Sequence, residues 1–133
     1  MSWSSAIDHM VTIIEAGTDL NRAPVAFSAE DIPDTLAGRV FCFGLDFSAD
    51  LGIPGSGRVL DRHAFEVRVL YRLGGNWLTD VKTMQDDSKA IRDALVVRGT
   101  YGHDIEVTGY QTERLEGTEY VIRSLQLTLT HSN

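Results

Sequence analysis

The last third of the chain alternates apolar and polar residues in two successive stretches, and this pattern predicts a long β-hairpin. Residues 105–113 and 119–131 carry the alternation, and residues 114–118 separate them. A period of two is typical of a strand that buries one face. A three-residue loop of Leu115, Glu116 and Gly117, with Gly117 in the left-handed backbone region, is a favoured connection between two such strands.

This loop also predicts the register of the hairpin. It sets Val107 opposite Leu125 on the core side, whereas a two-residue loop would set Leu125 against Thr108. The first register pairs apolar residues with each other and is therefore expected. Because monomers usually avoid exposed apolar patches, another part of the chain or another subunit is expected to cover the residues near the hairpin tip on the other side. These interface candidates are Tyr110, Tyr120 and Ile122.

Two helices are predicted, one near the N-terminus and one in the second half of the chain. Apolar residues at helical spacing predict a helix over residues 6–16. Ser5 begins a capping-box signature at its start, and Ser4 is an alternative cap. The second helix, over residues 77–98, has Asn76 as its N-cap. A break near Ser88, where the helix would restart, is the alternative. Asp86 and Asp87 are expected on its wet face, and its inner positions are Trp77, Val81, Met84, Ser88, Ile91 and Leu95.

Two strands precede the long helix. Alternation predicts one strand over residues 39–47 and another over residues 59–73. A loop over residues 48–57, rich in glycine, joins them. Residues 18–38 are expected to form an irregular connection, with a short strand at residues 25–27. The expected core faces of the two strands are Phe41, Phe43, Leu45 and Phe47, and Phe65, Val67, Val69 and Tyr71.

The order of these elements predicts an α+β fold. We expect a mostly antiparallel β-sheet with a short N-terminal helix and one long helix packed on one face, ending in a β-hairpin. A length of 133 residues is enough to bury a core and predicts a single domain over residues 1–133.

Composition narrows the class of protein. A net charge of −7 argues against a phosphate-binding surface. Cys42 is the one cysteine, so no intrachain disulfide can form, and a buried thiol is expected. The start of the chain lacks a signal-peptide pattern and no run of apolar residues is long enough to cross a membrane, so we expect a soluble, cytosolic protein.

The sequence predicts no catalytic residue, metal site or cofactor site. Four histidines are scattered without metal-ligand spacing: His9, His63, His103 and His131. Gly55-Ser56-Gly57 lacks the spacing of a nucleophile elbow. The glycines of residues 52–57 lead into a strand rather than a helix, which excludes a phosphate-binding loop. We therefore expect that the protein is not an enzyme.

The layout resembles the tail-terminator and neck (head-tail joining) proteins of long-tailed bacteriophages and related phage-tail-like particles. The short amphipathic helix at residues 7–14 and the strands joined by a long loop carry part of this resemblance. The rest lies in the strand that ends Leu70-Tyr71-Arg72-Leu73-Gly74-Gly75, the helix with Ile91 and Leu95, and the glycine-turned hairpin at residues 110–129. The resemblance extends over nearly the whole chain.

The resemblance implies a structural virion protein, made in the host cytoplasm, that forms a homo-oligomeric ring, commonly a hexamer. Such a ring caps the tail tube and joins it to the head, so its partners are the tail tube protein and a head-completion or neck protein. DNA passes through without specific binding, and no membrane is involved. The loop tip would contact the tube through Gly52, Ile53, Pro54, Gly55, Ser56 and Gly57. The alternatives are a small α+β enzyme or small-ligand-binding domain, with a pocket between sheet and long helix, and a simple dimeric interaction domain.

Overall fold

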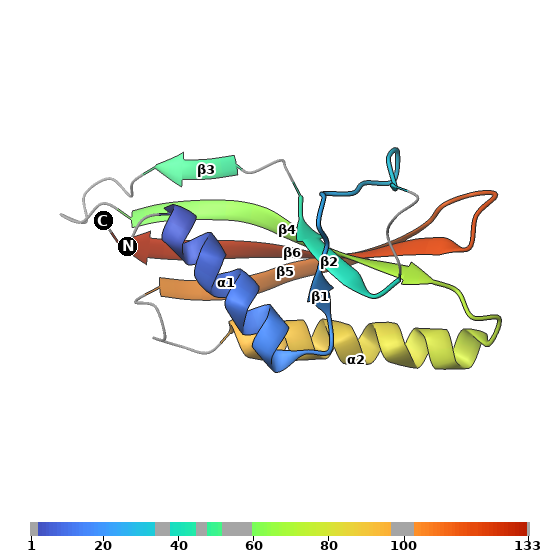
Figure 1. Ribbon diagram of the computed structural model, residues 1–133. Helices are drawn as coiled ribbons and strands as arrows, with labels where there is room; N and C mark the ends of the chain where they lie inside the picture. Colours follow the sequence, from blue (N-terminus) through green and yellow to red (C-terminus); the bar gives the residue numbers. More distant parts are fainter. Residues whose placement is uncertain (1–2, 34–37, 45–47, 52–59, 97–102, 133) are drawn as a thin grey trace.

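The computed structural model describes residues 3–33, 38–44, 48–51, 60–96 and 103–132, and its architecture is α+β, as the sequence predicts (Figure 1). This part of the chain forms two helices and one six-stranded sheet. In chain order the elements are α1 (Trp3–Gly17), β1 (Asn21–Arg22), β2 (Val40–Phe43), β3 (Ser48–Leu51), β4 (Leu60–Arg72), α2 (Trp77–Leu95), β5 (His103–Arg114) and β6 (Tyr120–Ser132).

The sheet is built around two long antiparallel strands, β4 and β6. Strand order is β1-β2-β4-β6-β5, and β3 also pairs with β4. β1 and β2 are parallel, and the other pairs are antiparallel. The loop predicted over residues 48–57 therefore begins with a short strand, because residues 48–51 pair with β4.

One face of the sheet carries both helices and the main core (Figure 1). The alternation predicted for β4 is confirmed, since its four inner residues Phe65, Val67, Val69 and Tyr71 are all buried. The other elements contribute apolar side chains at the spacing of their own period. These are Ala6, Met10 and Ile14 of α1, Ile91 and Leu95 of α2, and Val121, Leu125, Leu127 and Leu129 of β6.

Both helices differ from their predicted bounds: α1 is longer than predicted, and α2 ends at Leu95 rather than at residue 98. α1 begins at Trp3, so Ser5 lies inside the helix and the predicted cap is wrong. Nothing before Ser5 breaks a helix, and serine is tolerated in the first turns. α2 runs without a break past Ser88, and Asn76 caps it as predicted, accepting a hydrogen bond from the Thr79 amide at 3.3 Å.

A second, smaller cluster of apolar residues, called the back core below, covers the opposite face of the sheet. Residues 18–33 cross the sheet edge at β1 and bring Phe27 onto this face, where only 2% of it is exposed. The Arg68 guanidinium donates to the Phe27 carbonyl oxygen at 3.0 Å and holds the segment there. The buried members are Ala23, Phe27, Cys42, Leu70 and Ile122. The strand predicted at residues 25–27 is absent, because of these residues only Phe27 docks on the sheet, and it does so through its side chain and not through a ladder.

Burial of Cys42 leads to a testable prediction. Loss of water around the thiol raises the pKa of Cys42, so little of the reactive thiolate forms in the folded protein. We expect a disulfide reagent at pH 8 to label the folded protein at least ~10-fold more slowly than the urea-unfolded chain. Equal rates, followed by absorbance of the released thiol, would contradict the burial of this side chain.

The hairpin of β5 and β6 forms, but its predicted register is wrong. Val107 lies opposite Leu127, not Leu125. A β-bulge between Val107 and Gly109 then shifts the register, so that Tyr110 lies opposite Leu125. The bulge places one extra residue, Thr108, in β5 and turns every following side chain to the other face.

The turn of the hairpin is also longer than predicted. The amide of Leu115 donates to the carbonyl oxygen of Tyr120 at 3.1 Å, and the amide of Thr118 donates to the carbonyl oxygen of Leu115 at 3.2 Å. Residues 116–119 therefore form the loop in place of three residues. Gly117 has φ 73°, so the predicted left-handed glycine is confirmed.

Candidate interaction surface

The structure places the residues of the predicted aromatic patch on two different faces of the sheet. Tyr110 lies on the helix-bearing face and is 43% exposed. Ile122 is buried in the back core, and the half-buried Tyr120 packs against it. The prediction of one patch is therefore wrong, because the bulge at Thr108 separates its members. The contact role of Tyr110 stays a prediction. So does that of residues 52–57, which lie outside the described residues.

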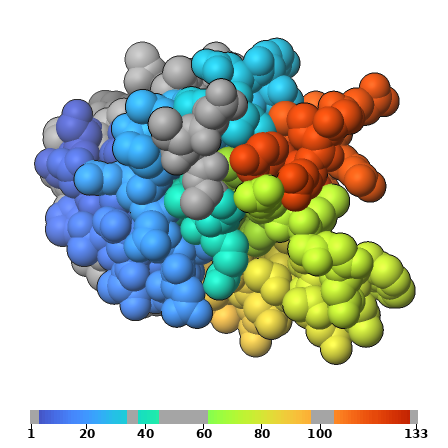
Figure 2. Space-filling view, turned by 45° about the vertical axis from the view of Figure 1, so that its right-hand side comes forward, coloured from blue at the N-terminus to red at the C-terminus, as the bar shows by residue number. Residues whose placement is uncertain are grey.

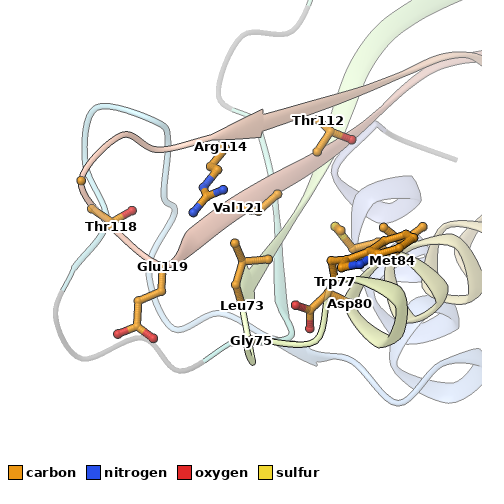
Figure 3. A pocket seen from close by; sticks show the side chains of 12 residues that line it. Leu73, Gly75, Trp77, Asp80, Met84, Thr112, Arg114, Thr118, Glu119 and Val121 are labelled. Atoms are coloured by element: carbon orange, nitrogen blue, oxygen red, sulfur yellow. The ribbon is translucent and has the colours of Figure 1, made fainter.

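A groove of about 650 Å³ lies between the first half of α2 and the free end of the β5–β6 hairpin, and we call it the α2–hairpin groove. Figure 2 shows it as a hollow between the orange lobe of the hairpin and the yellow-green lobe of α2. Its apolar lining comes from the end of β4, from α2 and from β6. These residues are Leu73, Trp77, Val81, Met84 and Val121 (Figure 3).

The groove exists because the first turns of α2 do not pack against the hairpin that faces them. The last turns of α2 pack on the sheet and bury Ile91 and Leu95. The first turns extend beyond that contact, so that Trp77 is 74% exposed and Val81 is 42% exposed. The helical period predicts the stripe that contains both residues. It does not predict where along the helix the sheet contact ends.

The turn from β4 into α2 sets the direction of the helix. Gly75 has φ 86°, a conformation that favours glycine. The Asp80 carboxylate accepts a hydrogen bond from the Gly74 amide at 3.3 Å, and Asn76 caps the first turn. These contacts hold the start of α2 at the end of β4, on the floor of the groove.

A buried carboxylate fastens the middle of α2 to the rest of the fold. Asp87, predicted on the wet face, is 6% exposed. It accepts hydrogen bonds from the Arg39 guanidinium at 2.8 Å and from the Tyr71 hydroxyl at 2.9 Å. Burial, with the Asp87 charge nearby, raises the pKa of Tyr71 well above its usual range. Arg39 has φ 62°, a strained backbone for a non-glycine residue, and it reaches α2 from the connection before β2.

A second polar contact joins α2 to the hairpin itself. Arg123 of β6 donates to the Ser88 hydroxyl at 3.2 Å and to the Thr112 hydroxyl at 2.7 Å. Its guanidinium lies over the Tyr110 ring, 5.1 Å from the centroid. These contacts close the gap between helix and hairpin next to the groove, so the groove ends where Arg123 crosses it.

Cations without a carboxylate partner gather along this seam between α2 and the hairpin. Arg114 at the groove wall makes none of the ion pairs found among the described residues, and the same holds for Lys89 and Arg123. The two carboxylates in the groove lining already accept hydrogen bonds within the chain. They are Asp80, which binds the Gly74 amide, and Glu119, which pairs with Arg72 at 3.1 Å.

The polar side chains in the groove lining are two carboxylates, two threonines and one arginine. Its lining contains neither histidine nor cysteine. Across the described residues, no group of three histidine, cysteine, aspartate or glutamate side chains could hold a metal ion. None of the described helices combines the length and the apolar character that crossing a membrane requires. What the groove offers is an apolar contact surface with charged ends.

Comparison with known proteins finds similarity at the level of structure alone. No protein-family model matches the sequence, and no curated protein matches it. The fold is similar to that of a solved chain from the virion of a native gene transfer agent particle, with a TM-score of 0.60. The likeness covers 93% of this chain and 84% of that chain at 17% sequence identity. The two chains therefore share a fold over nearly their full lengths.

Proposed function

We propose that this protein is a structural subunit of a phage-like particle, and that it acts as a tail terminator. In this role a ring of identical subunits caps the tail tube and joins it to the head. The observation that carries the proposal is the likeness over 93% of the chain to a component of a virion particle. The order of the helices and strands, and the local residue patterns that resemble tail-terminator proteins, point to the same class of protein.

The surface of the molecule fits a subunit of an assembly. Trp77, Leu78 and Val81 leave a large apolar area on α2 in contact with water, which a monomer usually avoids. Tryptophan is also among the residues that contribute most to protein interfaces. A subunit contact that covers these side chains would remove the cost of their exposure.

The ring is proposed to be a hexamer that binds the tail tube protein on one side and a head-completion or neck protein on the other. DNA would pass through the central channel. A net charge of −7 fits this role, since an acidic wall repels the phosphates of DNA and does not retain them. In this proposal the protein is located in the tail or neck of the virion.

A small-ligand-binding domain is the second candidate, because the groove lies between the sheet and α2, where such a pocket is expected. Ligand pockets combine apolar walls with a few polar groups that converge on the ligand. Here Asp80 and Glu119 are directed to partners within the chain instead. The groove is also open along one side (Figure 2). These features favour contact with a protein surface.

The mass of the protein in solution and its appearance in the electron microscope test the proposed function. We expect rings with a central hole, and a mass of six chains of 14.7 kDa each by light scattering at high protein concentration. The wild-type chain alone suffices for the measurement. A strict monomer from micromolar to millimolar concentration, with no rings in the micrographs, would contradict the proposal.

A further inference from the structure

A polar hollow of about 210 Å³ lies on the face of the sheet opposite the helices, and we call it the back hollow. Neighbouring residues of three strands form its floor, since Ser124 of β6 lies between Arg68 of β4 and Gln111 of β5. Side chains two residues apart on a strand share a face, so Ser124 points to the same side as Ile122. Ile122 lines the hollow and belongs to the back core, so the hollow begins where the back core ends.

The connection between β1 and β2 supplies one wall of the back hollow. The Ser28 amide donates to the Asp31 carbonyl oxygen at 3.0 Å, and the Asp31 amide donates to the Ser28 carbonyl oxygen at 3.2 Å. This tight turn brings Glu30 to the hollow. The hydrogen bond from Arg68 to the Phe27 carbonyl oxygen, at 3.0 Å, holds the turn against the sheet.

The lining of the back hollow contains a buried hydroxyl without a partner. Ser124 is 8% exposed and is one of three buried polar residues in the described part of the chain. Asp87 accepts a hydrogen bond from Tyr71, and Ser88 accepts one from Arg123, whereas the Ser124 hydroxyl makes none with the described residues. Buried hydroxyls in folded proteins are almost always hydrogen-bonded. A partner for Ser124 is therefore expected inside the hollow.

The charges around the back hollow sum to a negative value. Its lining holds the carboxylates of Glu30, Glu66 and Glu113 and the guanidinium of Arg68. Arg68 forms an ion pair with Glu66, so these two charges cancel. Neither Glu30 nor Glu113 makes an ion pair among the described residues. The hollow therefore presents two carboxylates whose charge no cation of its lining balances.

These groups select the chemistry of a ligand. The two carboxylates, the Ser124 hydroxyl oxygen and the Gln111 amide oxygen all accept hydrogen bonds. Glu30 and Glu113 come from different walls, and the described residues contain no group of three side chains that could hold a metal ion. A guanidinium group is always charged and spreads its five N–H donors over a plane, so it reaches several separated acceptors at once.

From these observations we infer that the back hollow binds a guanidinium group. Glu30 and Glu113 pair with its charge, and the Ser124 hydroxyl accepts one of its N–H donors. The group belongs either to a free guanidino compound or to an arginine side chain of another protein, and the tests below distinguish these two sources. The inference goes beyond the proposed function and does not depend on it, since the whole site lies within one chain.

The first test adds n-butylguanidinium to the wild-type protein and follows the backbone amide signals of Gln111 and Ser124 by NMR. We expect saturable shifts with a dissociation constant on the order of 1 mM, as suits a ligand of this size. n-Butylurea has the same planar end without the charge, and it is expected to bind at least ~10-fold more weakly. Shifts that do not saturate, or equal binding of the two compounds, would overturn the inference.

The second test removes the groups that are to hold the ligand. Glu30→Gln with Glu113→Gln is expected to raise the dissociation constant of n-butylguanidinium at least ~10-fold, and Ser124→Ala at least ~3-fold. Glu106→Gln is the matched control, because Glu106 is an exposed carboxylate of the same strand as Glu113 and does not line the hollow. All variants should keep the wild-type circular dichroism.

Two results of this test would overturn the inference. The first is wild-type affinity in the double variant or in Ser124→Ala. The second is an equal loss of affinity in Glu106→Gln, because binding would then reflect only the general attraction of a cation to an acidic protein.

A third measurement identifies the source of the guanidinium group. A blocked glycine–arginine–glycine tripeptide carries the group on a polypeptide, whereas n-butylguanidinium carries it on a free small molecule. If the tripeptide binds as tightly as n-butylguanidinium, the hollow receives an arginine side chain of another protein. If n-butylguanidinium alone binds, the ligand is a free guanidino compound. Rings in the micrographs without binding of either compound would leave the proposed function standing and overturn this inference.

Discussion

Replacing Phe27 by alanine is expected to lower the free energy of unfolding by about 3–4 kcal/mol, the usual cost of deleting a buried phenyl ring. Phe27 is 2% exposed and fills the back core between the sheet and residues 18–33. Its loss removes the side chain that holds this segment against Leu70 and Ile122. Urea unfolding followed by circular dichroism measures the change.

Val25→Ala is the control for this experiment. Val25 lies two residues before Phe27 and is 48% exposed, so its truncation should change the free energy of unfolding by no more than about 0.5 kcal/mol. A Phe27→Ala variant as stable as the control would mean that residues 18–33 do not cover the back of the sheet.

Replacing Asp87 by alanine is expected to lower the free energy of unfolding by about 2–3 kcal/mol, because the change leaves a buried donor without its acceptor. The Tyr71 hydroxyl, 2.9 Å from the carboxylate, loses its partner in the core. The Arg39 side chain is 43% exposed, so water replaces part of its lost contact, and the expected cost lies below that of a fully buried ion pair.

Asp86→Ala supplies the comparison for Asp87. The two carboxylates are adjacent on α2, but Asp86 is exposed and makes no ion pair among the described residues, so its removal should cost no more than about 0.5 kcal/mol. Equal losses of stability in thermal or urea unfolding would show that Asp87 does not fasten α2.

The sequence by itself determined which side chains of β4 and of the last turns of α2 face the core. The inner residues of β4, the buried positions in the last turns of α2, the Asn76 cap and the left-handed Gly117 all follow from local periodicity or local backbone preference. Local signals of this kind also determined the α+β class and the order of the main elements. They act over a few residues, so no knowledge of the distant chain is needed.

The tertiary structure alone decided how these elements pack together. This packing determines which side chains form the candidate surface. The bulge at Thr108 that separates Tyr110 from Tyr120 depends on the pairing of β5 with β6, and a one-residue shift reverses every side chain after it. The helical period places Asp87 on the same face as Ile91, but its partners Arg39 and Tyr71 come from distant segments and only the tertiary structure brings them to the carboxylate. The exposure of Trp77 likewise depends on where the sheet contact of α2 ends. Packing between segments far apart in the chain sets each of these features, and periodicity carries no information about it.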